Sequence, residues 1–470
     1  MPEQFYDFLV LGAGPAGHKA AIQAAKSGKS VMIVDRDPSA GGECVQRGTI
    51  PSKTLRESAC YMLGLRARSE GVIDVAVPAQ TKVASLMLRL KSVRVSHERY
   101  LNQQLERNKI ERLRGRARFL SPDTLEVRSP DKSVRRLRAG TIVIATGSKP
   151  RRPDNVPVDH EHILDSDSIL SLIYLPETLT VLGAGVIACE FASTFAALGV
   201  KVTMIDAAPR PLFFADPDLT TRFTAAFERM GGVFMPNRKV DSVVVEGSSV
   251  LTRLVGGGEI RSEKMLCAQG RAANVADLGL EVTGVRLGPR GHVQVDENMR
   301  TNVPHIYAAG DVVGPPALAA TAMEQGRRAA RHALGLSLHD GGEVVPGGIY
   351  TIPEISSVGL SEEQAIQKFG SAFVGRAKFE ELARAHINGQ TDGLLKLVAD
   401  PEGHVVGAHI VGESAIELVH VAQMALVAGL TLEAFVDNVF NFPTMAEAYR
   451  VAAIDAVARM ALARSSVKAA

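Results

Sequence analysis

The sequence is poor in cysteine, in long apolar runs and in net charge. Its 470 residues include 4 cysteines, at positions 44, 60, 189 and 267, which are too few and too scattered for the disulfide framework of a secreted protein. No stretch approaches the roughly 20 consecutive apolar residues that a membrane-spanning helix needs. Lysine and arginine number 53 against 51 acidic residues, and the net charge of +2 indicates no nucleic-acid or membrane partner.

The N-terminal segment also lacks the features of a targeting peptide. No basic stretch precedes the apolar run at residues 5–11, and no small-residue cleavage site follows it. We therefore interpret this run as a β-strand and expect a cytoplasmic protein. Basic residues are dense between Arg89 and Arg118, but Glu98 and Glu106 interrupt them, which predicts a solvated helix face. We identify no metal-ligating pattern.

One pattern that the sequence does contain occurs twice. Residues 12–17 read GAGPAG and residues 183–188 read GAGVIA, each between an apolar run and an alanine-rich helical stretch. A second apolar run then ends in an acid at the same spacing from the first glycine, Asp35 in one copy and Asp206 in the other. These features are typical of a dinucleotide-binding unit in which the acid reaches a ribose. The alternative role for Asp206 is to cap a helix or a turn.

Each position of the repeated pattern has a physical reason. The first glycine allows a tight turn, the second lets the backbone approach a pyrophosphate, and the third position keeps helix and strand close. The free N–H groups at the helix N-terminus favour phosphate. In order, these positions are Gly12, Gly14 and Gly17 in the first copy and Gly183, Gly185 and Ala188 in the second.

The remaining patterns indicate how the chain is organised. We expect one long amphipathic helix from Thr81 to Arg107, a buried strand from Thr141 that ends in a turn at Gly147, and a linker over residues 150–157. From Gly335 to about Gly348 we expect a loop. Beyond it the patterns predict strands over 393–398 and 404–410 and helices over 413–428 and 445–460. This order predicts an α/β fold with two Rossmann-like domains and a C-terminal α+β domain.

The most informative stretch is GGECVQRGTIPSK at residues 41–53. It closely resembles the redox-active segment of the flavoprotein disulfide reductases, in which two cysteines form a disulfide beside the flavin. Cys44 matches the first cysteine, but Thr49 stands at the second position, and a hydroxyl cannot form a disulfide. Cys60 is no substitute, because a helix from Pro51 onward would carry it roughly 13 Å along the axis. Cys44 is therefore an inert buried thiol or a single reactive one, and Cys189 and Cys267 are core residues.

A second departure from that family lies at residues 442–447, which read FPTMAE. The family carries a histidine before this Pro-Thr, and it acts as the acid–base of the thiol chemistry. Phe442 cannot transfer a proton, so both the electron relay and its base are missing. Glu447 remains without the imidazole that it would orient. An aromatic residue before Pro443 also favours a cis peptide bond.

The resemblance covers nearly the whole chain and implies FAD, NAD and NADP as the bound groups. It assigns residues 1–150 and 276–345 to FAD, residues 151–275 to NAD(P) and residues 346–470 to dimerisation, as a homodimer or a higher homo-oligomer. It implies that Lys53 and Glu190 are catalytic, because a cation beside the flavin stabilises negative charge that develops on it. The implied cofactor-binding residues are Gly12, Gly14, Gly17, Asp35, Gly42, Cys44, Thr49, Lys53, Thr146, Gly147, Gly183, Gly185, Asp206, Arg271, Asp311 and Ala319.

Four segments are especially similar to the soluble pyridine nucleotide transhydrogenases: GTIPSK at 48–53, DSDSILS at 165–171, YTIPEISSVG at 350–359 and NFPTMAEAYRVA at 441–452. This similarity implies Si-specific hydride transfer between NADPH and NAD⁺ through FAD, by a ping-pong scheme at one site. Nucleotide preference stays open, since Asp206 favours a free 2′-hydroxyl and Arg210 is suited to a 2′-phosphate. Two alternatives remain: an NAD(P)H oxidase or quinone reductase that uses Cys44 as a sulfenate, and a flavin-bearing regulatory protein.

Overall fold

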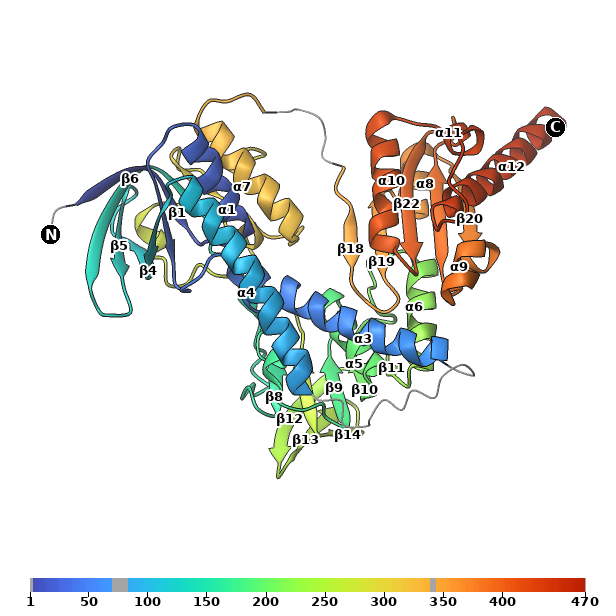
Figure 1. The fold of residues 1–470 in the computed structure, drawn as a ribbon, viewed down its shortest axis with the longest axis horizontal. Coiled ribbons are helices and arrows are strands. Elements are labelled where there is room, and N and C mark those ends of the chain that lie inside the picture. Colours follow the sequence, from blue (N-terminus) through green and yellow to red (C-terminus); the bar gives the residue numbers. More distant parts are fainter. Residues whose placement is uncertain (1–2, 70–82, 339–343, 470) are drawn as a thin grey trace.

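Three β-sheets organise the chain in the computed structural model, which describes residues 3–69, 83–338 and 344–469. Figure 1 shows them as three separate bodies, with the long helix α4 (Val83–Arg107) and helix α3 (Thr49–Ser69) running between them. The mixed first sheet, whose strands pair in parallel except for an antiparallel β4–β5–β6 edge (residues 116–144), the parallel second sheet and the antiparallel C-terminal sheet confirm the predicted fold class. None of the described helices is both long and apolar enough to cross a membrane.

The first sheet is built around the N-terminal strand. The apolar run becomes β1, which pairs in parallel with β2 and β6, and its residues are buried on both faces as expected for a central parallel strand. Helices α1 (Pro15–Lys26) and α7 (Ala319–Ala333) pack against each other on one face. The strands are β1 (Gln4–Leu11), β2 (Val31–Asp35), β3 (Glu111–Arg114), β4 (Arg116–Phe119), β5 (Thr124–Arg128), β6 (Val134–Ile144) and β17 (Ile306–Ala308).

The second sheet repeats the arrangement of the first, with strand order β11-β10-β9-β15-β8 and every pair parallel. Helix α5 (Val186–Ala197) follows its glycine loop, and α6 (Pro217–Arg229) follows the next strand. The strands are β8 (Ile163–Asp165), β9 (Thr178–Leu182), β10 (Lys201–Ile205), β11 (Val233–Met235) and β15 (Lys264–Cys267), beside a small antiparallel sheet of β12 (Val240–Glu246), β13 (Ser249–Leu254) and β14 (Glu259–Ser262).

The third sheet is antiparallel and belongs to the C-terminal segment. Two of its strands and two of its helices were predicted within a few residues, but the last helix continues to Ala469. The loop predicted from Gly335 to about Gly348 falls in part, at 339–343, outside the described residues, and β18 begins at Gly347. The Phe442–Pro443 bond is cis as expected. The elements are β18 (Gly347–Ile349), β19 (Ile355–Gly359), β20 (Phe373–Lys378), β21 (Leu394–Ala399), β22 (Val405–Val411), α8 (Glu362–Phe369), α9 (Ala383–Asn388), α10 (Ala415–Ala428), α11 (Glu433–Asp437) and α12 (Glu447–Ala469).

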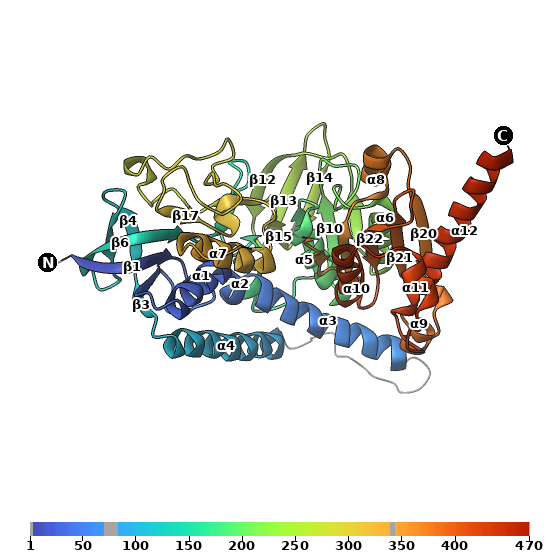
Figure 2. The same ribbon diagram turned by 90° about the horizontal axis from the view of Figure 1, so that it is seen from above.

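The segment that resembles the redox-active loop is helical almost throughout. Helix α2 (Gly42–Gln46) carries Cys44, and α3 begins at Thr49 and carries Cys60, as the distance argument required. The predicted start of the long helix at Thr81 lies outside the described residues. Within α4 most charged side chains are exposed, as predicted for a solvated face, but the helix ends at Arg107 and the arginines from Arg112 to Arg118 lie on β3 and β4. Figure 2 shows α4 along one edge of the molecule.

The chain passes between the first two sheets at one place. Strand β7 (Ser148–Pro150) leaves the first sheet, strand β16 (Arg271–Ala273) returns to it, and the two pair antiparallel. The predicted linker over 150–157 is therefore wrong at its first residue, because Pro150 still pairs with Arg271. The sequence pattern missed this pair because three residues are too few to show an alternation. The domain limits at 150, 275 and 345 stay a prediction.

Candidate functional site

A cavity of about 580 Å³ lies where the first sheet, the β7–β16 crossing, α3 and the start of α5 meet. This volume is typical of a small-molecule or cofactor site. Most of the predicted site residues line it, namely Gly12, Gly14, Asp35, Gly42, Cys44, Thr49, Lys53, Thr146, Gly147, Glu190, Arg271, Asp311 and Ala319. Of the other predicted residues, Gly17 packs against the backbone of Gly12. Gly183 and Gly185 belong to the second glycine loop, and Asp206 is hydrogen-bonded to that loop.

The first glycine loop is shaped by backbone contacts. Gly12 has φ +107°, and a Cβ there would lie 2.3 Å from the carbonyl oxygen of Ala145 at the end of β6. A Cβ on Gly17 would lie 1.9 Å from the Gly12 oxygen, so both positions require glycine. Helix α1 begins without a side-chain cap, which leaves its first N–H groups for an anion in the cavity.

The acid of this first unit holds the glycine loop. The Asp35 carboxylate accepts hydrogen bonds from the backbone N–H groups of Ala13 (2.5 Å) and Asp37 (2.8 Å). Burial raises the pKa of Asp35, and these two N–H groups oppose that rise. The cavity reaches the same carboxylate, so a ribose hydroxyl there would meet an acceptor already fixed in place.

The second glycine loop repeats the first contact for contact. A Cβ on Gly183 would lie 2.7 Å from the carbonyl oxygen of Ala268, the counterpart of Ala145. The Asp206 carboxylate accepts from the N–H groups of Ala184 and Ala208, both at 2.7 Å. Asp206 therefore does cap the turn after β10, which is the alternative role that the sequence left open. The carboxylate is also held where the sequence pattern expects a ribose.

Arg210, one of the two residues between which nucleotide preference was left open, makes its contacts within its own loop. Its guanidinium donates to the carbonyl oxygens of Phe213 (2.8 Å) and Ala215 (2.9 Å) and to the Thr220 hydroxyl (3.0 Å). It also lies 5.0 Å from the centroid of the Phe213 ring. Arg210 thus shapes its own loop, which a sequence cannot reveal because an arginine near a ribose acid has the same spacing in either role.

An ion pair forms one wall of the cavity. Lys53 Nζ on α3 lies 2.6 Å from Glu190 Oε2 on α5, and the second carboxylate oxygen accepts from the Tyr350 N–H at 2.9 Å. The ammonium group also lies 4.7 Å from the centroid of the Tyr350 ring. This contact gathers three distant segments of the chain around one cation. The Lys53–Glu190 pair was predicted, but the contact with Tyr350 was not, although Tyr350 opens the 350–359 segment that resembles the transhydrogenases.

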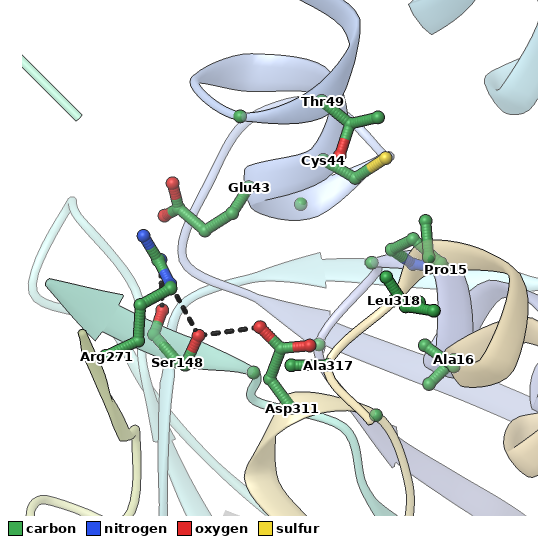
Figure 3. Close-up of a pocket in the computed structure, with 18 of the residues that line it drawn as sticks. Pro15, Ala16, Glu43, Cys44, Thr49, Ser148, Arg271, Asp311, Ala317 and Leu318 are labelled. Atoms are coloured by element: carbon green, nitrogen blue, oxygen red, sulfur yellow. Dashed lines mark hydrogen bonds between the residues drawn. The ribbon is translucent and has the colours of Figure 1, made fainter. Parts of the chain in front are cut away.

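Another part of the cavity lining is a chain of hydrogen-bonded polar side chains, shown in Figure 3. Arg271 Nε donates to Ser148 Oγ at 2.7 Å, and Ser148 Oγ donates to Asp311 at 2.7 Å. Arg271 also lies 3.4 Å from the Asp167 carboxylate. Ser148 was missed, since a serine after a glycine turn carries no signal. The paired strands β7 and β16 bring it between the two predicted residues.

Glu43 is a second residue of the wall that the sequence did not single out. Its Oε1 lies 2.7 Å from Arg36 and 2.9 Å from Arg47, whereas Oε2 is buried with no hydrogen-bond partner in the described protein. Burial raises the pKa of this carboxyl. In Figure 3 its side chain points toward that of Arg271. This carboxylate therefore keeps one buried oxygen whose hydrogen-bonding capacity is unused.

All four cysteines lie within the described residues, and all four are free thiols. In Figure 3 the Cys44 and Thr49 side chains lie side by side. Burial raises the pKa of the Cys44 thiol, although the Thr49 hydroxyl and the charge of Lys53 oppose the rise. Burial likewise raises the pKa of Cys60 to about 11. Cys189 and Cys267 are buried and their thiol pKa values are raised too, which confirms their core role.

The C-terminal motif at residues 442–447 leads into helix α12. Phe442 is 69% exposed, and Glu447 accepts from the Thr444 N–H at 3.3 Å where α12 begins. Among the described residues no group of three histidine, cysteine or acidic side chains is placed to hold a metal ion.

Comparison with known proteins gives consistent results along the chain. Residues 6–326 match the pyridine nucleotide-disulphide oxidoreductase family model, and residues 345–453 match the model of its dimerisation domain. A soluble pyridine nucleotide transhydrogenase of Mycobacterium bovis is 42% identical, with 97% of this chain and 98% of that protein aligned. The protein of the same description from Hahella chejuensis is 40% identical over 98% of this chain and all of its own length.

Solved structures extend the comparison to three dimensions. LpdA from Mycobacterium tuberculosis superposes with a TM-score of 0.88 at 28% identity, over 96% of this chain and 99% of that one. The HOCl-induced flavoprotein disulfide reductase RclA from Escherichia coli superposes with a TM-score of 0.87 at 26% identity, with the same coverage. The three-sheet arrangement is therefore shared with flavoprotein reductases.

The raised thiol pKa of Cys44 predicts slow alkylation. Only the thiolate is nucleophilic, so at neutral pH the folded protein should react with iodoacetamide much more slowly than free cysteine does. The rate should rise as the pH passes above the ordinary thiol value. Mass spectrometry of labelled peptides measures this, with the denatured chain as the control in which all four cysteines react. Fast labelling of Cys44 at neutral pH would contradict the prediction and favour the single-cysteine oxidase.

Proposed function

The chain belongs to the pyridine nucleotide-disulphide oxidoreductase family, and on that premise we propose that it is a flavoprotein transhydrogenase. The proposed reaction moves a hydride between NADPH and NAD⁺. In this proposal residues 1–150 and 276–345 form the domain that binds FAD, and residues 151–275 form the domain that binds the nicotinamide dinucleotides. Residues 346–470 form the dimer contact. We also propose a cytoplasmic location. Si-specificity stays a prediction.

The observation that carries this proposal is the cavity that joins the first glycine loop to the Lys53–Glu190 pair. Its volume, its close-packed glycine backbone and the uncapped start of α1 fit an adenine dinucleotide. Asp311, Gly42 and Ala319 line the same cavity and are the proposed contacts to the rest of FAD. When bound, FAD supplies the reversible two-electron chemistry that accepts and returns a hydride.

Lys53 and Glu190 are the proposed catalytic residues. The ammonium group is a fixed positive charge, held by the Glu190 carboxylate and the Tyr350 ring, and it lines the cavity beside Val186 and Ile187 at the start of α5. A preorganised cation stabilises negative charge on a neighbouring ring without reorganisation. We propose that each nicotinamide in turn enters at this end of the cavity.

The proposed mechanism uses no thiol. Thr49 and Phe442 stand where the disulfide reductases have their second cysteine and their acid–base, and the buried Cys44 thiol has a raised pKa. With neither relay nor base, a hydride taken from one nicotinamide leaves most readily to the next. A ping-pong exchange at one site follows from this reasoning.

The dimer proposal is supported by an exposed apolar face on α10. Val421, Met424 and Val427 lie three residues apart on one side of this helix and are 37%, 57% and 63% exposed. Ile454 and Leu462 on α12 are also exposed. An apolar face of this kind is typical of an association surface. We propose that a second copy of the chain covers it.

A charge on this face should dissociate the dimer. Met424→Glu would bury an unpaired carboxylate in the contact, which costs several kcal/mol. We expect light scattering at micromolar concentration to give the dimer mass for the wild type and the monomer mass for the variant. Leu88→Glu on α4, which replaces an exposed residue on another surface, should stay dimeric. A wild-type monomer with full activity would overturn the dimer proposal.

Transhydrogenation itself tests the proposed function. The purified FAD-loaded protein should reduce a thionicotinamide analogue of NAD⁺ with NADPH, and Cys44→Ser should leave the rate largely unchanged. Lys53→Met should slow flavin bleaching by NADPH on the order of a hundredfold, because a preorganised charge is lost. Lys91→Met, on the exposed face of α4, is the matched control.

Three outcomes of that assay would count against the proposal. A protein that cannot take up FAD lacks the proposed cofactor. Loss of transhydrogenation in Cys44→Ser with FAD still bound would favour the single-cysteine oxidase. FAD binding with no turnover of either nucleotide would favour the regulatory protein.

Asp206 should bias the site toward NADH. Its carboxylate accepts hydrogen bonds from ribose hydroxyls and repels a 2′-phosphate, so Asp206→Asn should lower the NADH-to-NADPH ratio of kcat/KM by roughly tenfold to a hundredfold. The ratio is the informative quantity, because Asp206 also holds the Ala184 N–H and its loss weakens both nucleotides. Asp241→Asn on the exposed face of β12 should leave the ratio unchanged. An unchanged ratio in Asp206→Asn would assign discrimination to another residue.

A further inference from the structure

The loop over residues 206–216 connects β10 to α6 and is fixed to the second glycine loop. The Ala184 N–H donates to Asp206, and the Ala184 carbonyl oxygen accepts from the Leu212 N–H at 2.8 Å. Leu212 is fully buried at φ +48°, a conformation that a leucine keeps only when its surroundings enforce it. The position of Leu212 therefore sets the position of the glycine loop.

Inside the loop, Arg210 transmits this constraint to the start of α6. It donates to the carbonyl oxygens of Phe213 and Ala215 and to Thr220 in the first turn of the helix. The Ala215 N–H donates to the Leu212 oxygen at 2.8 Å. The loop is thus hydrogen-bonded along its whole length and has little freedom to move without α6.

The far end of the loop is held by the C-terminal domain. Asp216 caps α6 by accepting from the Asp218 N–H at 2.9 Å, and it lies 2.8 Å from Lys396 Nζ on β21. Only 4% of the Lys396 side chain and 2% of the Asp216 side chain are exposed. In Figures 1 and 2 helix α6 lies directly against the C-terminal sheet that carries β21 and β22.

Lys396 is also the centre of a larger charge cluster. It lies directly across from Arg376 on β20, and like charges in that register repel each other. Asp218 and Glu362 neutralise them, since each lies 2.8–3.1 Å from Lys396 and 3.0 Å from Arg376. Removing the lysine charge would leave Asp216 without its cation and Asp218 and Glu362 with Arg376 alone. Two of those carboxylates belong to the start of α6.

We propose that Lys396, in the C-terminal domain, is a positioning residue for nicotinamide dinucleotide binding. It fixes Asp216, and through Asp216 the 206–216 loop and the second glycine loop. The inference rests on the proposed function, because that function assigns the dinucleotides to this loop. Loss of Lys396 should weaken the binding of both NAD⁺ and NADP⁺. The Lys396–Asp216 contact fixes the 206–216 loop and does not itself touch the 2′ position of the ribose.

Isothermal titration calorimetry of the FAD-loaded protein with NAD⁺ and with NADP⁺ tests this proposal. In Lys396→Met both dissociation constants should rise roughly three- to thirtyfold, with their ratio unchanged. Asp216→Asn should have a similar effect, although asparagine keeps the helix cap. Because the two residues act as a pair, the double variant should bind no more weakly than the worse single variant.

The matched control is a second ion pair between α6 and the same domain. Arg229, at the opposite end of α6, pairs with Asp392 at 2.5 Å, and both side chains are exposed. Arg229→Met should leave both dissociation constants unchanged. In turnover, Lys396→Met should raise KM for both nucleotides and leave kcat within about twofold, whereas Arg229→Met should change neither.

The outcomes separate this inference from the proposed function. A wild-type protein that binds neither nucleotide would overturn the proposed function. A wild type that binds both, with unchanged dissociation constants in Lys396→Met, would overturn only the positioning role. If Lys396→Met does not fold, Asp216→Asn decides: unchanged binding in that variant overturns the proposal, and weakened binding of both nucleotides supports it. A changed ratio of the two constants would also overturn it.

Discussion

The Glu190 carboxylate is the contact on which the site depends. One of its oxygens holds the Lys53 ammonium group and the other accepts the Tyr350 N–H, so helix α5, helix α3 and the segment before β19 meet at one charged group. Burying a charge is costly unless every partner is present, and here both oxygens have one. The same arrangement that satisfies the acid leaves the cation facing the cavity. Local stability and chemistry therefore have one cause.

The contacts between the three sheets follow the same rule. The β7–β16 crossing carries Ser148 and Arg271 to Asp311, and the Lys396 cluster fixes α6 to the C-terminal sheet. In each case a polar group from one sheet satisfies a partner from another. A cavity between rigid bodies keeps its shape only when such contacts fix their relative positions. The two walls of the flavin-sized cavity are held in this way.

Much of the fold could be predicted because its signals are local. The apolar runs before Gly12 and Gly183 became central parallel strands, and the acid at each second strand lies against its glycine loop. The error at the linker came from a short pattern. Strand β7 has three residues, which are too few to show the apolar alternation that normally marks a strand. The contacts of Arg210 within its loop could not be predicted, because spacing does not report what a side chain contacts.

By itself, the sequence determined the chemistry that this protein can carry. The paired glycine patterns indicate dinucleotide units. A threonine at position 49 cannot form a disulfide with Cys44, and Phe442 cannot transfer a proton, whatever the fold. Only the tertiary structure decided which groups act together. Tyr350 meets Glu190 across 160 positions, and Lys396 meets Asp216 across 180. Such pairs arise from the packing of sheets against one another, a long-range constraint that leaves no periodic trace in the chain.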